Sequence, residues 1–214
     1  MNMPPIFCIW NREIPRREIT EAHFNSHGIR ATFFEGIHGK TFNVGSAEPH
    51  SKKADGTDWY ISQGHVGLCL SHYMVWSHIW HSGFPEAIVL EDDAFFGVTF
   101  HNQLRLARSS LPKNWHMCYL GWLHRGHDRD MTQVRKNIYR INNGCPFGTH
   151  AMLIKREGIR ILLDTQRGMR DHIDINIWKR SMPHMNTYFV YPSIVTQRSQ
   201  NGKKQKPNAF KPTV

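Results

Sequence analysis

Three consecutive carboxylates, Glu91, Asp92 and Asp93, form the segment of this sequence best suited to chemistry. They directly follow Ala87-Ile88-Val89-Leu90, an apolar run that predicts a buried strand. Ionised carboxylates are not buried without a compensating charge, so the three acids belong at the end of that strand. Ligands of open α/β sheets bind at the carboxyl ends of strands. Clustered carboxylate oxygens there suit a hard cation, Mg²⁺ or Mn²⁺, that bridges to a phosphate. A solvated acidic turn is the alternative interpretation.

A second pair of acids, Asp171 and Asp174, lies three residues apart. This spacing allows both side chains to face one side of a helical turn. Either carboxylate could accept a proton from the hydroxyl of an acceptor molecule. The alternative for Asp171 is a structural one, as the N-cap of a helix.

Several polar residues are candidates for binding an anionic ligand. Arg12, Arg16 and Arg17 follow the first predicted strand and could contact phosphate groups, although a solvated helix surface explains them equally well. Ser71 and His72 lie on a predicted helix near the acidic segment, although a histidine on a mostly apolar helix is more often a core residue. The segment 36–41 is similar to the end of a phosphate-binding loop. We interpret it as a turn, because Phe34 stands where that loop needs glycine.

The elements that must position these residues follow from the hydrophobic pattern. The segments 6–10 and 31–34 read as strands on either side of a helix over 13–26, a βαβ unit that requires a parallel sheet. Further strands are predicted at 87–90, 117–120, 151–154 and 189–191, further helices at 66–79 and 157–163, and a loop over 41–60. We therefore predict an α/β fold with a mostly parallel central sheet, as one domain over residues 1–200.

Length and composition exclude several classes of protein. The chain has 214 residues, of which 40% are hydrophobic and 21% charged, so it is neither disordered nor fibrous. Its length allows a core without disulfide or metal cross-links. No apolar run reaches the ~18–20 residues of a membrane helix, and the N-terminus does not resemble a secretory signal. The four cysteines lie far apart, which predicts reduced, buried thiols in a cytoplasmic protein.

The charge balance is strongly basic. The 27 Lys and Arg residues exceed the 17 Asp and Glu residues, for a formal net charge of +10. Five positive and no negative residues follow Gln197, so we predict a basic C-terminal tail over 201–214; the five are Arg198, Lys203, Lys204, Lys206 and Lys211. Such a surface attracts polyanions, including nucleic acid, anionic lipid and phosphorylated glycans. A solvated tail without a partner is the alternative.

Taken in chain order, five segments resemble glycosyltransferase family 25, which contains lipooligosaccharide and collagen galactosyltransferases. The segments are Phe34–Gly39, Gly64–His72 with Trp76, Ile88–Ala94, Trp115–Gly121, and Gly148–Ala151 with Gly158. The resemblance extends over about residues 6–200. The sequence departs from the family pattern at His65, where the family usually has Glu, and at Leu68, where it has Cys. Its first strand ends in Trp10-Asn11 rather than Asn-Leu.

The resemblance implies a GT-A-like fold that binds a nucleotide sugar. It also implies an inverting transfer of a hexose, galactose or glucose, from a UDP-sugar donor. Asp93 would hold Mn²⁺ (or Mg²⁺) against the diphosphate and Glu91 would approach the ribose, so that the cation neutralises charge on the departing UDP. An inverting transfer needs one base, for which we favour Asp174 and then Asp171. The donor site would include Trp10, Asn11, Arg12, Arg17, Ser71, His72 and Asp92, and His150 is a further candidate.

The acceptor stays open at this point. A glycan such as lipooligosaccharide is the family default, and the basic charge favours an anionic one. A hydroxylated base in DNA is an alternative, since Lys and Arg contacts to phosphates dominate DNA affinity. A non-catalytic polyanion-binding module on a degenerate transferase fold, or a metal-dependent hydrolase of the donor, would also fit. For all of these we expect a cytoplasmic protein, with peripheral contact at the inner face of a membrane as an option.

Overall fold

The computed structural model describes residues 3–12, 14, 16–39, 51–52, 58–59, 62–123, 131–167 and 171–198. The predicted tail over 201–214 and most of the predicted loop over 41–60 lie outside these residues. Two short strands of that loop are described, β3 (Ser51–Lys52) and β4 (Asp58–Trp59), which pair with each other.

The centre of the molecule is an eight-stranded sheet with the strand order β2-β1-β5-β10-β7-β11-β9-β8. Its strands are β1 (Ile6–Trp10), β2 (Thr32–Glu35), β5 (Glu86–Glu91), β7 (Met117–Leu123), β8 (Met131–Arg135), β9 (Ile138–Ile141), β10 (Phe147–Lys155) and β11 (Thr187–Val190). The pairings show that β9 and β10 run opposite to the other six strands. The predicted α/β fold with a mostly parallel sheet is therefore confirmed.

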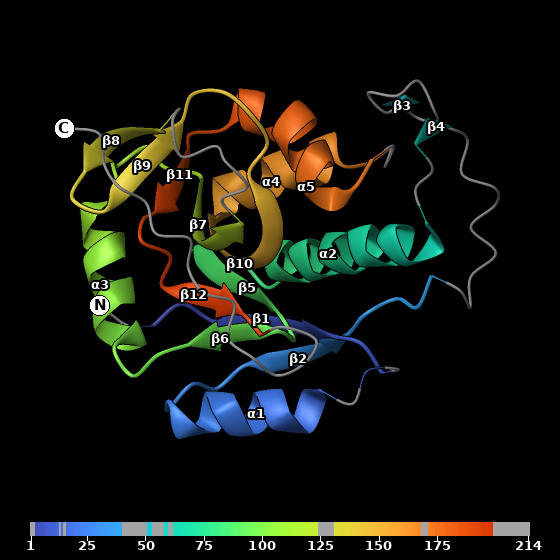
Figure 1. The fold of residues 1–214 in the computed structure, drawn as a ribbon, viewed down its shortest axis with the longest axis horizontal. Coiled ribbons are helices and arrows are strands. Elements are labelled where there is room, and N and C mark those ends of the chain that lie inside the picture. The colour runs from blue at the N-terminus through green and yellow to red at the C-terminus, as the bar shows by residue number, and fades with distance from the viewer. Residues whose placement is uncertain are drawn as a thin grey trace.

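Helices cover both faces of this sheet (Figure 1). The side chains of α1 (Arg17–Ser26) and α3 (Phe100–Ser110) pack on one face, and those of α2 (Gln63–His81), α4 (Arg156–Thr165) and α5 (Ile173–Asn176) pack on the other. A π-helical turn (Ile177–Ser181) and a 3₁₀ turn (Met182–His184) follow α5. Alternate residues of each central strand enter opposite cores, as the pleat requires. In β5, for example, Ile88 and Leu90 face one core while Ala87 and Val89 face the other.

The observed elements extend or shift the predicted ones by a few residues. The first helix begins at Arg17 rather than at position 13. Pro15 accounts for the later start, because a proline disfavours helical backbone at the residue before it. The helix α2 begins earlier than predicted, because the Ser62 side chain accepts the His65 N–H at 3.3 Å and caps its first turn. The four cysteines are buried free thiols, as predicted.

A smaller pair of strands lies beside the main sheet. β6 (Ala94–Phe96) follows the acidic segment directly, and β12 (Val195–Gln197) pairs with it in antiparallel register. This pairing brings the end of the described chain next to the end of β5. Within the described ranges, no helix has the length and apolar character needed to cross a membrane.

Candidate active site

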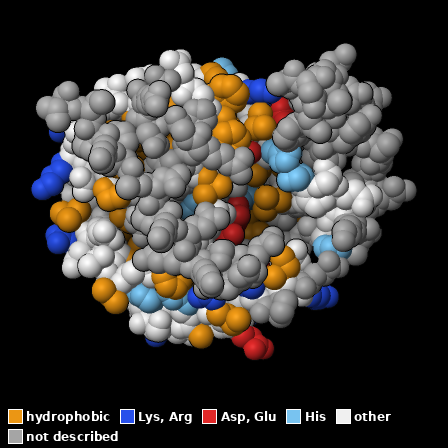
Figure 2. Space-filling view, viewed as in Figure 1, with side chains coloured by type: hydrophobic (Ala, Val, Ile, Leu, Met, Phe, Trp, Pro, Cys, Tyr) orange, Lys and Arg blue, Asp and Glu red, His pale blue; other side chains and the backbone are white. Residues whose placement is uncertain are grey.

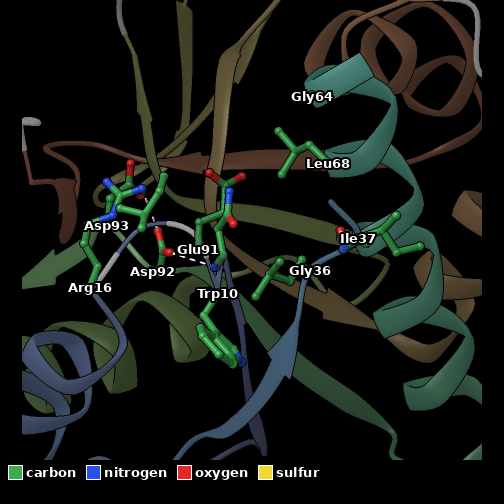
Figure 3. Close-up of a pocket in the computed structure, with 13 residues that line it drawn as sticks. Trp10, Arg16, Gly36, Ile37, Gly64, Leu68, Glu91, Asp92 and Asp93 are labelled. Atoms are coloured by element: carbon green, nitrogen blue, oxygen red, sulfur yellow. Dashed lines mark hydrogen bonds and ion pairs between the residues drawn. The ribbon is translucent and has the colours of Figure 1, made fainter. Parts of the chain in front are cut away.

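The three acids of the sequence occupy the turn between β5 and β6. Glu91 is the last residue of β5, whose preceding four residues are fully buried, and Asp92 and Asp93 form the turn. The carboxyl end of the sheet therefore presents these carboxylates, as the sequence predicts (Figure 3).

Asp92 joins this turn to the segment that follows β1. Its side chain accepts the backbone N–H of Asn11 at 3.0 Å and forms an ion pair with Arg16 at 3.0 Å. Its carbonyl oxygen accepts the hydroxyl of Thr20 at 2.6 Å. Burial raises the pKa of Asp92, although the Asn11 N–H and the charge of Arg16 oppose the shift. These contacts hold the Asp92 carboxylate in place and tie the acidic turn to the segment after β1 and to α1.

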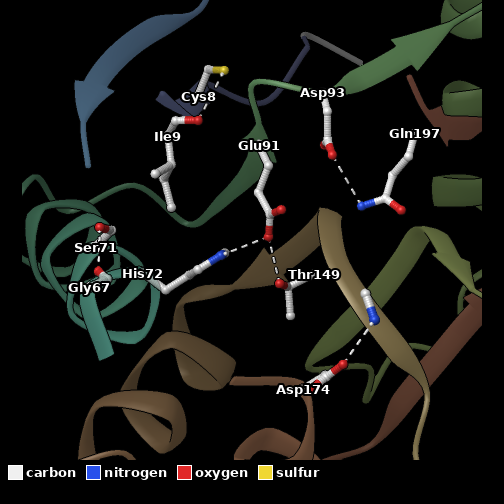
Figure 4. Close-up of polar contacts among 11 residues, drawn as sticks. Cys8, Ile9, Gly67, Ser71, His72, Glu91, Asp93, Thr149, Asp174 and Gln197 are labelled. Atoms are coloured by element: carbon white, nitrogen blue, oxygen red, sulfur yellow. Dashed lines mark hydrogen bonds and ion pairs between the residues drawn. The ribbon is translucent and has the colours of Figure 1, made fainter. Parts of the chain in front are cut away.

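Glu91 is held by two buried side chains (Figure 4). His72 Nε2 lies 3.1 Å from Glu91 Oε1, and the Thr149 hydroxyl donates to the same oxygen at 2.6 Å. Burial alone raises the pKa of Glu91, but these hydrogen bonds and the charge of His72 outweigh it, so the pKa lies below its ordinary value. Glu91 is therefore an ionised, rigidly oriented carboxylate.

Asp93 is the least satisfied of the three acids. Gln197 donates its amide N–H to Asp93 Oδ2 at 3.3 Å, while Oδ1 is buried and has no hydrogen-bond partner among the described residues. Burial, together with the charges of Glu91 and Asp92, raises the pKa of Asp93 to about 7, against the opposing charge of Arg16. A buried carboxylate oxygen without a partner is costly unless a proton or a cation meets it.

Two cavities adjoin at these acids. The first, which we call the Arg16 pocket, has a volume of about 230 Å³ and lies between the ends of β1 and β5, the loop after β2 and the start of α2. Its lining comprises Ile9, Trp10, Asn11, Ile14, Arg16, Gly36, Ile37, Gly64, Leu68, Ser71, Glu91, Asp92 and Asp93. Figure 2 shows acidic side chains at the bottom of a hollow near the middle of this face.

The second cavity, which we call the Asp174 pocket, has a volume of about 360 Å³. Its lining comprises His65, Leu68, Glu91, Leu123, Phe147, Gly148, Thr149, His172, Ile173, Asp174, Ile175 and Gln197. Because Leu68 and Glu91 line both cavities, the two pockets meet at these side chains. A two-substrate reaction at Glu91 could use one pocket for each substrate.

The two acids proposed as a base differ in their surroundings. Asp174 lines its pocket, and its carboxylate accepts the backbone N–H groups of Gly148 at 3.3 Å and Ile175 at 2.9 Å. Asp171 is buried outside the pocket lining, where it forms an ion pair with Lys179 at 3.0 Å. The geometry therefore favours Asp174 as the residue that meets a substrate.

The predicted donor-site residues divide into two groups. Trp10, Asn11, Ser71 and Asp92 line the Arg16 pocket, together with Glu91 and Asp93. Arg12 and Arg17 do not line it: Arg12 forms an exposed ion pair with Glu35 at 2.9 Å, and Arg17 lies over the Trp10 ring at 4.8 Å. Of the three arginines, Arg16 is the one at the pocket.

Two histidines that the sequence suggested as site residues line neither pocket. His72 is fully buried and acts on the site through Glu91. His150 is buried in the sheet, burial lowers its pKa, and it lines neither pocket.

Sequence reasoning assigned no role to Thr149, His172 or Gln197. Thr149 lies within the segment Gly148–Ala151, whose resemblance to the family pattern was the available signal. His172 lines the Asp174 pocket with His65, and their ring centroids are 3.7 Å apart. Burial, then the neighbouring His172, lowers the pKa of His65. Gln197 lies in no motif, and its position follows only from the pairing of β12 with β6.

Residues 3–177 match the family model described as glycosyltransferase family 25 (LPS biosynthesis protein). The chain belongs to this family. The match includes β1, β5, the acidic turn and both candidate bases. The resemblance inferred from the five sequence segments is therefore confirmed.

Several curated family 25 proteins are similar to this chain. It is 27% identical over 169 residues to a glycosyltransferase 25 family member of Anopheles gambiae, with 72% of this chain and 27% of the relative covered. It is 26% identical over 164 residues to the inactive glycosyltransferase 25 family member 3 of Homo sapiens, with 74% and 25% covered. It is 28% identical over 119 residues to procollagen galactosyltransferase 1 of Danio rerio, with 51% and 20% covered. This family 25 chain thus spans about a quarter of the length of these relatives.

Among solved structures, the family 25 chain is similar to a glycosyltransferase involved in glycosylation of the major capsid of PBCV-1. The TM-score is 0.48, the sequence identity is 11%, and the alignment covers 87% of this chain and 81% of that one.

Proposed function

We propose that this chain is a cation-dependent, inverting glycosyltransferase that moves a hexose, galactose or glucose, from a UDP-sugar to an acceptor hydroxyl. The observation that carries the proposal is the position of Glu91 where the two pockets meet, with the unpartnered oxygen of Asp93 in the adjoining turn. The donor would occupy the Arg16 pocket and the acceptor the Asp174 pocket. The family description, which names LPS biosynthesis, supports a glycan such as lipooligosaccharide as acceptor.

The acids of the turn fit Mn²⁺ or Mg²⁺ bound together with a diphosphate. Such cations are typically held by one or two carboxylates plus substrate phosphates and water. Within the described part of the chain, no three His, Cys, Asp or Glu side chains form a metal site by themselves. Asp93, through Oδ1, and Glu91 would hold the cation, which would neutralise charge on the departing UDP.

The chain's own residues would divide the remaining work. The end of β1, with Trp10 and Asn11, and the start of α2 would enclose the nucleotide. Asp174 is oriented by the backbone N–H groups of Gly148 and Ile175. It would accept the proton of the acceptor hydroxyl as the hydroxyl oxygen bonds to the anomeric carbon of the sugar. The bond from that carbon to the UDP oxygen breaks in the same step, so the products are a glycoside, UDP and the proton on Asp174.

The test measures UDP released from a panel of UDP-sugars, with and without a panel of glycan acceptors, in Mn²⁺ or in EDTA. We expect one sugar donor to give cation-dependent release. Asp174→Asn should lower turnover by about 10²–10⁴-fold, the usual contribution of a positioned base. Asp164→Asn is the matched control, because Asp164 is an exposed acid on α4 outside both pockets. Equal turnover by Asp174→Asn and the control would refute the assignment of the base.

A non-catalytic role is the second candidate, because the human relative is named an inactive family member. In that case no donor would be turned over with any acceptor. The protein would still bind a polyanion such as heparin, and Asp93→Asn would leave this affinity unchanged. Cation-dependent UDP release by the wild type would exclude this candidate.

A further inference from the structure

The contacts of Asp93 come from the far end of the described chain. Gln197, which is 104 positions later, donates its amide N–H to Asp93 Oδ2 at 3.3 Å. The next residue, Arg198, donates its backbone N–H to the carbonyl oxygen of Asp93 at 2.7 Å. The side chain and the backbone of Asp93 are thus both held by one short segment. Figure 4 shows the side-chain contact with Gln197.

This segment is fixed by its own packing. In the antiparallel pairing of β12 with β6, Gln197 lies opposite Ala94, the residue that follows Asp93. Val195, at the start of β12, is completely buried in the core shared with α1 and α3. The distance from Gln197 to Asp93 is therefore set by strand pairing and burial.

The chemistry of the amide defines what this contact does. Only the NH₂ end of a glutamine side chain can donate to a carboxylate, so the Gln197 amide nitrogen faces Asp93. This hydrogen bond uses Oδ2 and restricts rotation of the carboxylate. It leaves Oδ1, which is buried and without a partner among the described residues, as the oxygen available to a cation.

We propose that Gln197 is a positioning residue, whose amide orients the Asp93 carboxylate for binding of a divalent cation with the donor diphosphate. This inference rests on the proposed function. Gln197 also lies beyond residue 177, where the match to the family model ends, so the family match assigns it no role. Groups that hydrogen-bond a metal ligand typically change metal affinity by 10–100-fold when removed.

The test uses the full chain and measures Mn²⁺ affinity in the presence of UDP, from the electron paramagnetic resonance signal of free Mn²⁺. Gln197→Met keeps the length of the side chain and removes the donor. We expect about tenfold weaker Mn²⁺ binding, which corresponds to about 1.4 kcal/mol. The readout is Mn²⁺ affinity rather than turnover, because Gln197 also lines the Asp174 pocket, where the acceptor would bind.

Thr196→Val is the matched control. Thr196 lies on the same strand, and its hydroxyl donates to the carbonyl oxygen of Phe95 at 3.2 Å. We expect this variant to bind Mn²⁺ within twofold of the wild type. Gln197→Asn is a second test variant, because its amide is one methylene shorter and should not reach Asp93; it should also bind about tenfold more weakly. Thermal unfolding without the cation should be similar in all four proteins.

Three results would overturn the inference. Wild-type affinity in both Gln197 variants would show that Asp93 needs no orientation, provided that Asp93→Asn abolishes binding. Equal losses in Gln197→Met and Thr196→Val would show that the strand, not the amide, matters. If the wild type itself binds no Mn²⁺ with UDP, the cation-dependent function fails together with this inference, which separates that outcome from the first two.

Discussion

The hydrogen bond from Thr149 to Glu91 offers a sharp test of how the site is held. Thr149 is buried, and its hydroxyl lies 2.6 Å from Glu91 Oε1. Thr149→Val keeps the shape of the side chain and replaces the hydroxyl by a methyl group. The carboxylate then retains His72 as its remaining side-chain partner in the described site, at 3.1 Å.

The expected cost follows from the charge on the acceptor. Hydrogen bonds to charged groups contribute about 1.5–3 kcal/mol, and a buried carboxylate that loses a donor also bears its own desolvation. We therefore expect Thr149→Val to lower the free energy of unfolding by about 2 kcal/mol near neutral pH. Thr149→Ser is the control, because it keeps the hydroxyl and should lose only about 1 kcal/mol for the missing methyl group.

The pH dependence separates this mechanism from a general packing defect. The pKa of Glu91 is lowered in the folded protein, so its stabilisation is complete above the unfolded-state pKa and is lost as pH falls through the folded-state pKa. Removing the Thr149 donor should raise the folded-state pKa. The gap between Thr149→Val and the wild type should consequently hold near neutral pH and shrink as pH falls towards and below about 4.5, the ordinary glutamate pKa.

Urea unfolding followed by tryptophan fluorescence measures both effects. The expected result is a lower transition midpoint for Thr149→Val at neutral pH, with a smaller gap in acid. The control should show a gap that does not change with pH. A variant as stable as the wild type at neutral pH, or a cost independent of pH, would refute the claim that this hydroxyl stabilises an ionised Glu91.

Three further outcomes are expected. Gly67→Ala should cost about 1–3 kcal/mol in urea unfolding, because a Cβ there would overlap a backbone oxygen of the loop after β2. Gly64→Ala should be neutral or stabilising, because its Cβ would meet only the Ser62 hydroxyl oxygen, at an ordinary contact distance of 3.7 Å. Arg16→Met should lower the free energy of unfolding by about 2 kcal/mol, because it leaves the buried carboxylate of Asp92 without its cation. Arg12→Ala should change this free energy by less than about 1 kcal/mol, because the ion pair of Arg12 with Glu35 is exposed. Burial, then the charges of His27 and Arg198, lowers the pKa of His23 to about 4. Stability should therefore fall as pH drops from about 6.5 towards 4, by about 1–2 kcal/mol because solvent screens this half-buried ring. His23→Gln should flatten this slope in pH-dependent unfolding.

Most of the core elements were predictable, because their side chains are buried on both faces. Strands that are buried on both faces appear as continuous apolar runs, such as Ala87–Leu90 and Ile6–Trp10, and are therefore easily located in the sequence. Elements with a narrow apolar face were missed. The helix α3 buries only Phe100, Leu104 and Ala107, a spacing that could have revealed it. In β8 four of the five residues are exposed, so its pairing with β9 left little hydrophobic signal.

The part of the site whose residues are contiguous in the sequence could be predicted. The acidic turn follows its strand directly, so its location needed only the strand assignment. The sequence could not distinguish Arg16 from Arg12 and Arg17. Which of the three side chains lines the pocket depends on the direction that each takes from the backbone after β1. The choice of Asp174 over Asp171 likewise depends on burial that neighbouring elements impose.

The reversed strand β10 explains why Thr149 could not be placed from sequence. A strand parallel to β5 would bring its carboxyl end to the acidic turn. Because β10 is antiparallel, with Ala151 opposite Leu90, its beginning reaches that edge instead. The irregular register of β10 against β7 near Ala151 then falls beside Thr149, and such irregularities re-aim side chains next to sites. Thr149 therefore meets Glu91 through strand direction, which the order of elements along the chain does not specify.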